Sequence, residues 1–305
     1  MKTLSALQKD ILALKKDKDV AILAHSYQTH DILEIADVTG DSFQLSVAAS
    51  KLPQQTVILC GVRFMAETVK LLSPDKTVYL SHADAGCPMA EQMTREEIAA
   101  WRKDHPNHAV VAYINTTTAL KTVCDVCVTS SSAVKIVERM PQKDILFIPD
   151  CNLGSFVKAS CPEKNITLLQ GGCPVHTAIT AEEAKAAKAA HPNALLLCHP
   201  ECLPDVSRQA DFLGSTADIM RFARESEHRE FIIGTENAIL DHLQYECPDK
   251  RFYPLSKRLI CPDMKLTTLN DIYRILNGEG GEEIRLDADT SEKAKACIDR
   301  MLALG

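Results

Sequence analysis

The chain has 305 residues, of which 46% are hydrophobic, and its net charge is −7. This length favours two or three domains, and the negative charge argues against the broad basic surface that binding to nucleic acid requires. Because no apolar run reaches the roughly 20 residues of a membrane span and the start has no signal-peptide core, we expect a soluble, cytoplasmic protein that does not bind membranes.

In chain order, the predicted elements begin with an amphipathic helix over residues 1–18 and an apolar strand over 21–24. Two helical stretches, a strand over 57–60, a helix and a third strand complete this first group. The same order then occurs twice more, with its first two strands at 109–112 and 145–148, and again at 195–198 and 231–233.

Several short markers recur at the same places in all three groups. The clearest are Pro74-Asp75-Lys76, Pro162-Glu163-Lys164 and Pro248-Asp249-Lys250, with Asp37, Asp125 and Asp211. The offset is 88 residues from Pro74 to Pro162 and 86 residues from Pro162 to Pro248. Capping boxes starting at Thr94 and Thr180 open the second and third groups. The sequence is therefore a threefold internal repeat.

The strands are short continuous apolar runs, which is typical of sheets covered by helices on both faces. Strands that alternate with helices favour right-handed crossovers and parallel pairing. We predict an α/β protein of three pseudo-equivalent three-layer αβα domains, with parallel sheets, around a pseudo-threefold axis. The predicted domains span 1–86, 87–172 and 173–267, and the tail 268–305 is expected to join the first.

Polar side chains follow the first strand of each repeat, where open α/β sheets bind ligands. These tripeptides are His25-Ser26-Tyr27, Tyr113-Ile114-Asn115 and His199-Pro200-Glu201. A single histidine after a strand is more often a structural hydrogen-bonding residue. Three reactive tripeptides at equivalent positions favour a shared site instead.

A helix start with a hydroxyl residue follows in each repeat, at Ser42, Ser130 and Thr216. These residues are either simple N-caps or part of an anion site. Helix N-termini bind carboxylate and phosphate through free backbone N–H groups and a positive dipole end. We expect them to bind a small substrate with several anionic groups, in spite of the negative net charge.

The twelve cysteines, in a chain of this size without an export signal, are expected to be free thiols or metal ligands. Only Cys87, Cys173 and Cys261 recur in all three repeats, each followed by proline and each seven residues before a helix-capping threonine. Three thiolates favour zinc or an iron–sulfur cluster and leave one coordination position open. An open position indicates Lewis-acid chemistry, such as an elimination or a condensation.

Other cysteines offer weaker candidates. Cys124 and Cys127 have the C-x-x-C spacing of zinc sites, but no second pair lies at a suitable distance, so a structural or incidental role is expected. Cys198 and Cys202, on either side of the His199 tripeptide, are predicted to be packing residues.

The sequence resembles the quinolinate synthase family over nearly its whole length. The matching stretches, in order, are His25–Gln28, Gly40–Ser42, Phe64–Glu67, Gly86–Met89, Tyr113–Asn115, Thr129-Ser130, Pro149-Asp150, Asn152–Gly154, Gly172–His176, His199–Glu201 and Cys261–Lys265. The resemblance implies three αβα domains around one 4Fe–4S cluster, and the condensation of iminosuccinate with dihydroxyacetone phosphate to quinolinate, phosphate and water for NAD biosynthesis. It also implies a link to the L-aspartate oxidase or dehydrogenase that supplies iminosuccinate.

The resemblance also assigns roles to individual residues. Substrate-binding or catalytic positions are His25, Ser42, Tyr113, Asn115, Ser130, His199, Glu201 and Thr216, and the cluster ligands are Cys87, Cys173 and Cys261. Glu201 is predicted to be the main general acid and base, assisted by His199 and His25, with Tyr27 and Tyr113 as catalytic residues that gate or orient the substrate. The alternatives are another iron–sulfur hydro-lyase acting on a small carboxylate and a non-catalytic iron–sulfur sensor or electron carrier.

Overall fold

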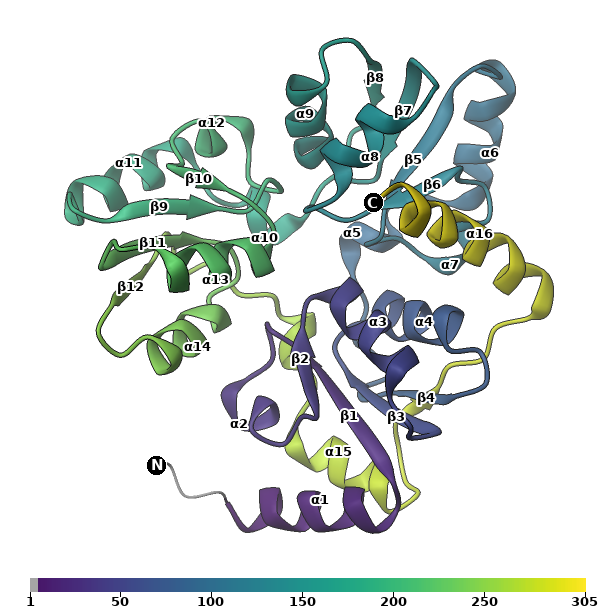
Figure 1. Cartoon of the computed structure of the whole chain (residues 1–305), viewed down its shortest axis with the longest axis vertical. Coiled ribbons are helices and arrows are strands. Elements are labelled where there is room, and N and C mark those ends of the chain that lie inside the picture. Colours follow the sequence, from purple (N-terminus) through teal and green to yellow (C-terminus); the bar gives the residue numbers. More distant parts are fainter. Residues whose placement is uncertain (1–4) are drawn as a thin grey trace. The chain divides into compact units, whose positions relative to one another are not determined.

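The computed structural model describes residues 5–305, whose strands form three separate sheets with flanking helices (Figure 1). The predicted α/β class, with three parallel-sheet αβα units, is confirmed. The contacts within the chain divide it into two compact units. The first contains residues up to Cys87 and Cys261–Ser291, and the second contains Pro88–Ile260 and Glu292–Gly305.

The first unit contains a five-stranded sheet in the order β13-β4-β3-β1-β2. Its strands pair in parallel, except that β13 is antiparallel to β4. The strands are β1 (Val20–His25), β2 (Val38–Gly40), β3 (Thr56–Cys60), β4 (Thr77–Leu80) and β13 (Glu282–Glu283). The helices are α1 (Ala6–Asp17), α2 (His30–Leu33), α3 (Ser42–Lys51), α4 (Arg63–Leu72), the 3₁₀ turn η1 (Asp263–Lys265) and α15 (Leu269–Leu276).

The second unit contains two four-stranded parallel sheets, in the orders β6-β5-β7-β8 and β10-β9-β11-β12. Their strands are β5 (Ala109–Tyr113), β6 (Val126–Val128), β7 (Asp144–Ile148), β8 (Asn165–Leu168), β9 (Leu195–Cys198), β10 (Phe212–Leu213), β11 (Glu230–Gly234) and β12 (Arg251–Pro254). The helices are α5 (Pro88–Glu91), α6 (Arg95–Asp104), α7 (Thr118–Lys121), α8 (Ala133–Arg139), α9 (Cys151–Ser160), α10 (Pro174–Thr177), α11 (Ala181–Ala190), α12 (Pro204–Ser207), α13 (Thr216–Glu225), α14 (Ala238–Glu246) and most of α16 (Ala288–Leu304).

The recurrent aspartates anchor the first strand of each repeat. The carboxylate of Asp37 accepts the N–H of Ile22 and pairs with Lys15. Asp125 binds Val110 and Arg102 in the same way, and Asp211 binds Leu196 and Lys188. Each aspartate therefore fixes the start of a central strand to the preceding helix.

The recurrent lysines close the C-terminal ends of three equivalent helices. The buried ammonium of Lys76 donates to the carbonyls of Leu52 and Gln54, just beyond α3. Lys164 and Lys250 make the equivalent contacts beyond α8 and at the end of α13. A cation at this end satisfies unpaired carbonyls and complements the helix dipole. The Pro-Asp-Lys marker is thus part of the framework of each repeat.

The tail that was expected to join the first repeat is divided between the two units. Helix α15 packs on α1 through Ile272, Ile275 and Leu276, and β13 extends the first sheet (Figure 1). The final residues belong to the second unit, where Cys297 of α16 lies against Cys127 of β6. None of the helices in residues 5–305 is long and apolar enough to cross a membrane.

Candidate functional site

Two of the predicted site histidines have the same local geometry. His25 is the last residue of β1, and its Nδ1 accepts the N–H of Tyr27 at 3.1 Å. His199 follows β9, and its Nδ1 accepts the N–H of Glu201 at 3.3 Å. A backbone N–H can only donate, so the neutral ring carries its proton on Nε2 in both cases. Burial lowers the pKa of His199 to about 4, which keeps this ring neutral.

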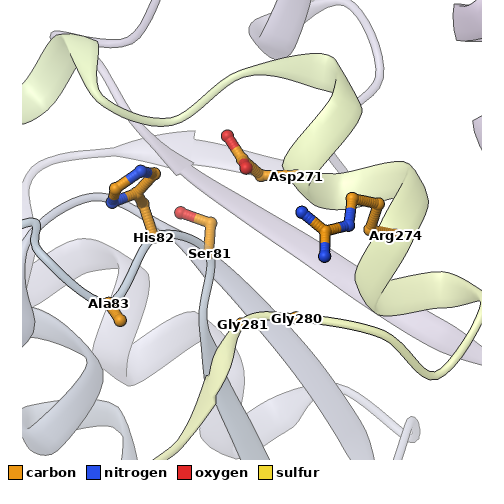
Figure 2. A pocket seen from close by; sticks show the side chains of 7 residues that line it. All are labelled: Ser81, His82, Ala83, Asp271, Arg274, Gly280 and Gly281. Carbon is orange, nitrogen blue, oxygen red and sulfur yellow. The ribbon is translucent and has the colours of Figure 1, made fainter.

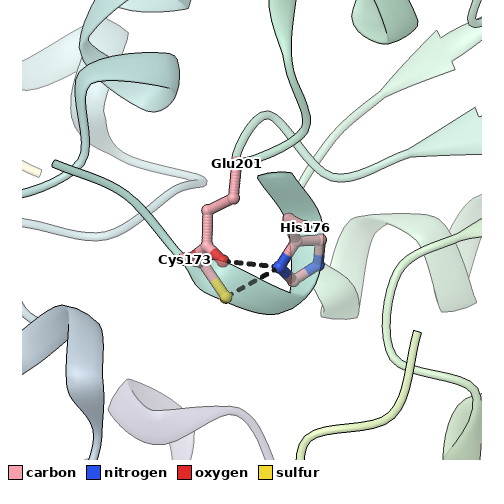
Figure 3. A group of neighbouring side chains, drawn as sticks. All are labelled: Cys173, His176 and Glu201. Atoms are coloured by element: carbon pink, nitrogen blue, oxygen red, sulfur yellow. Dashed lines mark hydrogen bonds and ion pairs between the residues drawn. The ribbon is translucent and has the colours of Figure 1, made fainter. Parts of the chain in front are cut away.

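His176 lies between Glu201 and Cys173 in a polar cluster whose histidine and glutamate are buried (Figure 3). The carboxylate Oε2 of Glu201 is 2.9 Å from His176 Nδ1, and the same nitrogen is 3.2 Å from Cys173 Sγ. The other ring nitrogen of His176, Nε2, is 3.0 Å from Thr235 Oγ1. Among residues 5–305 this is the one group of three His, Cys, Asp or Glu side chains that could hold a metal ion.

The protonation states of Glu201 and His176 depend on each other. Burial raises the pKa of Glu201, but His199, His176 and a hydrogen bond from Tyr113 outweigh it and hold that pKa at about 2. Burial lowers the pKa of His176, but the neighbouring Cys173 and the Glu201 carboxylate raise it well above its usual value. At neutral pH the pair is therefore a carboxylate and an imidazolium, and the mobile proton is on His176.

A second carboxylate holds the backbone around this cluster. Asp150, which is fully buried, caps α9 by accepting the N–H groups of Asn152 and Leu153, and its other oxygen accepts the N–H of Cys173 at 3.1 Å. The side-chain amide of Asn152 donates to the carbonyl of Glu201. Burial and the Glu201 charge raise the pKa of Asp150 to about 7. The first turn of α9 thus positions both Cys173 and Glu201.

The hydroxyl residues at the helix starts are not the N-caps. The caps are Asp41, Ser132 and Ser215, whereas Ser42 and Thr216 are the first helical residues of α3 and α13. Both are buried. Ser130 precedes the cap of α8 and is half-buried, as is Asn115 beyond β5. The capping alternative for these three hydroxyls is therefore wrong, and their anion-binding role stays a prediction.

The three recurrent cysteines occupy similar loops. Cys173 is the N-cap of α10, Cys87 immediately precedes α5, and Cys261 lies just before η1. All three are half-buried. Accessible thiols, each at the start of a proline-bounded turn, suit the thiolate donor set of an iron–sulfur cluster. Their convergence on one cluster stays a prediction.

The weaker cysteine candidates have ordinary surroundings. Cys127 is buried against Cys297, with their sulfurs 3.2 Å apart. Cys198 and Cys202 belong to the apolar core of the third repeat, as expected for packing residues.

A separate cavity of about 160 Å³ lies beyond β4 in the first unit (Figure 2). Its polar lining already has partners: Ser81 Oγ is 2.6 Å from Thr267 Oγ1, and Asp271 accepts the N–H of Thr268. We assign this cavity no part in the site.

Four residues of the cluster had been given no role from the sequence: His176, Asp150, Asn152 and Thr235. His176 lies three residues after Cys173 and so shares its helical face in α10, a spacing that is visible in the sequence.

Comparison with known proteins places the chain in one family. The family profile described as Quinolinate synthetase A protein matches residues 9–303. The quinolinate synthase of Caldicellulosiruptor bescii is 45% identical over 302 residues, 99% of each chain. That of Thermodesulfovibrio yellowstonii is 46% identical over 296 residues, 97% of each, and that of Methanoregula boonei is 45% identical over 298 residues, 98% of each. From this near-complete match we conclude that the chain belongs to the quinolinate synthetase A protein family.

Proposed function

We propose that this protein is a quinolinate synthase that condenses iminosuccinate with dihydroxyacetone phosphate to quinolinate, phosphate and water, in the biosynthesis of NAD. The observation that carries the proposal is the buried group of Glu201, His176 and Cys173 in a chain that belongs to this family. Iminosuccinate is unstable, so we propose that an L-aspartate oxidase or dehydrogenase supplies it.

The proton transfers are assigned to the Glu201–His176 pair. Forming a pyridine ring from these substrates requires enolisation and loss of water, and both need a group that gives and takes protons. Glu201 alone is too weak a base, since its pKa is held at about 2, whereas His176 carries the exchangeable proton 2.9 Å away. Neutral His199 donates from Nε2 to a substrate oxygen, and His25, with the same local geometry, is assigned a similar role.

The anionic groups of the substrates are assigned to the helix starts. Ser42 and Thr216 lie in the first turns of α3 and α13, where backbone N–H groups and the helix dipole favour carboxylate and phosphate. Ser130 and Asn115 are assigned to substrate binding in the second repeat. Tyr27 and Tyr113 are assigned to orienting the substrate, and Tyr113 also bonds to Glu201.

Cys87, Cys173 and Cys261 would hold one 4Fe–4S cluster. Three thiolates would leave one iron without a protein ligand, and the cluster would then supply a Lewis acid suited to reactions that lose water. Asp150 accepts the backbone N–H of Cys173, and the side-chain amide of Asn152 donates to the carbonyl of Glu201. The first turn of α9 therefore holds Cys173 and Glu201 at a defined separation.

An anaerobic assay tests the proposed reaction. Protein purified with its cluster should form quinolinate and phosphate in equal amounts from dihydroxyacetone phosphate and enzymatically generated iminosuccinate. Omission of either substrate is the control. Failure of the cluster-loaded protein to form quinolinate contradicts the proposed reaction.

A spectroscopic titration tests the open iron position. A planar dicarboxylate such as quinolinate should change the absorption or electron paramagnetic resonance spectrum of the cluster, because it can reach an iron that has no protein ligand. A monocarboxylate of similar size is the control. Binding of the dicarboxylate, measured by calorimetry, without any spectral change would remove the Lewis-acid role.

A further inference from the structure

The three side chains in Figure 3 have the chemistry of a mononuclear metal site as well as that of a proton-transfer group. We propose that Cys173, His176 and Glu201 bind one Zn²⁺ ion in the cluster-free protein. The zinc site and the proposed cluster site have Cys173 in common. The other two zinc ligands, His176 and Glu201, are not cluster ligands. Only the statement that Cys173 also binds the cluster rests on the proposed function.

The geometry of the donor atoms supports the proposal. The three donor atoms lie within 4.8 Å of one another, with Nδ1 of His176 2.9 Å from a Glu201 oxygen and 3.2 Å from the sulfur. In a tetrahedral zinc site with bonds of 2.0–2.3 Å, donor atoms lie roughly 3.3–3.6 Å apart. The two contacts of His176 Nδ1 need to lengthen by only a few tenths of an ångström to admit the ion.

One ring nitrogen of His176 faces both a carboxylate oxygen and a sulfur. A single N–H group makes one strong hydrogen bond, so it cannot satisfy both the Cys173 sulfur and the Glu201 oxygen. A cation between the three donors contacts all of them. Because a thiolate and a carboxylate carry two negative charges, a divalent ion also neutralises the buried group.

The surroundings of His176 resemble those of histidines that bind metals. Its Nε2 is 3.0 Å from Thr235 Oγ1, so the neutral ring can donate there and keep the Nδ1 lone pair directed at the other two ligands. Metal-binding histidines commonly have such a partner on the second nitrogen. The N–H of Cys173 is likewise held by Asp150.

The donor set selects the metal. A mixed sulfur, nitrogen and oxygen set suits zinc, whereas Mg²⁺ and Ca²⁺ prefer oxygen ligands alone. His176 and Glu201 are 2% and 4% exposed, and Cys173 is half-buried, so the ion would enter past the sulfur. Zinc and the cluster compete, because both require the Cys173 thiolate.

The test is a zinc titration of cluster-free protein under anaerobic conditions, in competition with a chromophoric chelator. The three cluster cysteines could themselves bind zinc, so the decisive protein is the double variant Cys87→Ser with Cys261→Ser, which cannot hold the cluster. We expect it to bind one zinc as tightly as the wild type. Added to this double variant, Cys173→Ser and His176→Ala should each weaken zinc binding by at least about a hundredfold. Cys151→Ser, which changes another half-buried thiol, should leave zinc binding unchanged in the same background.

Thr235→Val, introduced into the same double variant, is a milder change that keeps all three zinc ligands. It should weaken zinc binding roughly 10–100-fold, as loss of a ligand's hydrogen-bond partner usually does. Far-ultraviolet circular dichroism and thermal melting establish that each variant is folded. Loss of zinc in the double variant, or normal binding by folded His176→Ala or Thr235→Val, overturns the proposal.

Co²⁺ reports the ligands directly. Bound to the double variant, it should give thiolate charge-transfer absorption that Cys173→Ser removes, and absence of this band also overturns the site. Zinc-loaded wild type should fail to accept a cluster until zinc is chelated. If zinc binds as expected but does not block cluster assembly, the shared ligand is wrong, while the zinc site stands. Neither outcome depends on the quinolinate assay.

Discussion

At the scale of single residues, backbone N–H groups determine which nitrogen of His25 and of His199 carries the proton in the neutral ring. The N–H two positions after His25 and after His199 bonds to Nδ1, so each neutral ring presents an N–H at Nε2. The residue that supplies this N–H is Tyr27 in the first repeat and Glu201 in the third. The repeat therefore keeps the backbone contact while the side chain at the equivalent position changes its chemistry.

Glu201→Gln should lower turnover by about 100- to 10,000-fold, which is the usual contribution of general acid–base catalysis. The amide keeps the shape but removes the Glu201 charge, which together with Cys173 raises the pKa of His176. Steady-state kinetics on protein of matched iron content measures the effect, and Glu227→Gln, at an exposed glutamate, is the control. A large rise in KM with nearly normal kcat would assign Glu201 to substrate binding alone.

Repetition explains which site residues could be found from the sequence. Glu201, His199 and the three cysteines have counterparts in the other repeats, so the offset identifies them. The positions equivalent to His176, three residues after each cysteine, are Ala90 and Met264. A search for recurrent polar groups therefore passes over His176, and its role depends on the side-chain contacts in one repeat alone.

At the scale of secondary structure, the main strands and the capped helices were predictable, because continuous apolar runs and capping boxes are local signals. The short edge strands β2, β6 and β10 were not predicted. They contain only two or three residues each, too few to show a period, and they form through pairing with the neighbouring strands.

Lys250→Met should destabilise the third repeat by about 3 kcal/mol, because it leaves the carbonyls of Ala223, Arg224 and Ser226 without the donor that they share. Urea unfolding of cluster-free protein measures the loss. Lys257→Met, at an exposed lysine, is the control and should be neutral. Equal stability of the two variants would mean that water replaces the ammonium at the end of α13.

The attachment of β13 should depend on pH. Arg63 makes two hydrogen bonds of 2.6 Å to Glu282, and this contact lowers the pKa of Glu282 below its reference value of 4.5. The stabilisation is therefore present above pH 4.5 and is lost as pH falls through the lower folded-state pKa. Because both groups are about one third exposed, we expect only about 0.5–1 kcal/mol.

Acid unfolding of cluster-free Glu282→Gln tests this attachment. The variant should be less stable than wild type at pH 7 and should approach it at the lowest pH. Glu292→Gln, in α16, should follow the wild type throughout. A stability difference for Glu282→Gln that stays constant with pH would exclude the ion pair as its cause.

At the scale of the whole molecule, each proposed cluster ligand follows the last parallel strand of a different sheet: β4, β8 or β12. The substitutions Cys87→Ser, Cys173→Ser and Cys261→Ser should each abolish both the cluster and activity. No other cysteine recurs in all three repeats to replace the lost ligand. Iron and sulfide analysis after anaerobic purification measures this. Cys161→Ser is the control, because the first repeat already has Ser73 at the equivalent position. An intact cluster in Cys173→Ser would disprove the ligand assignment.

The three parallel αβα sheets followed from the internal repeat, but the course of the tail did not. Residues 269–276 form α15, which packs against α1, whereas residues 292–305 belong to the second unit. These contacts depend on complementary apolar faces that come together only in the folded chain, so sequence periodicity identifies the helices without identifying their partners.

The packing of α15 on α1 has a consequence for synthesis of the chain. The core around Ile11, Ile22 and Ile58 is closed by Ile272 and Ile275, which are synthesised only after the second and third repeats. Domains generally fold as they emerge, the N-terminal one first. Here part of the apolar face of the first sheet stays uncovered until α15 has been synthesised.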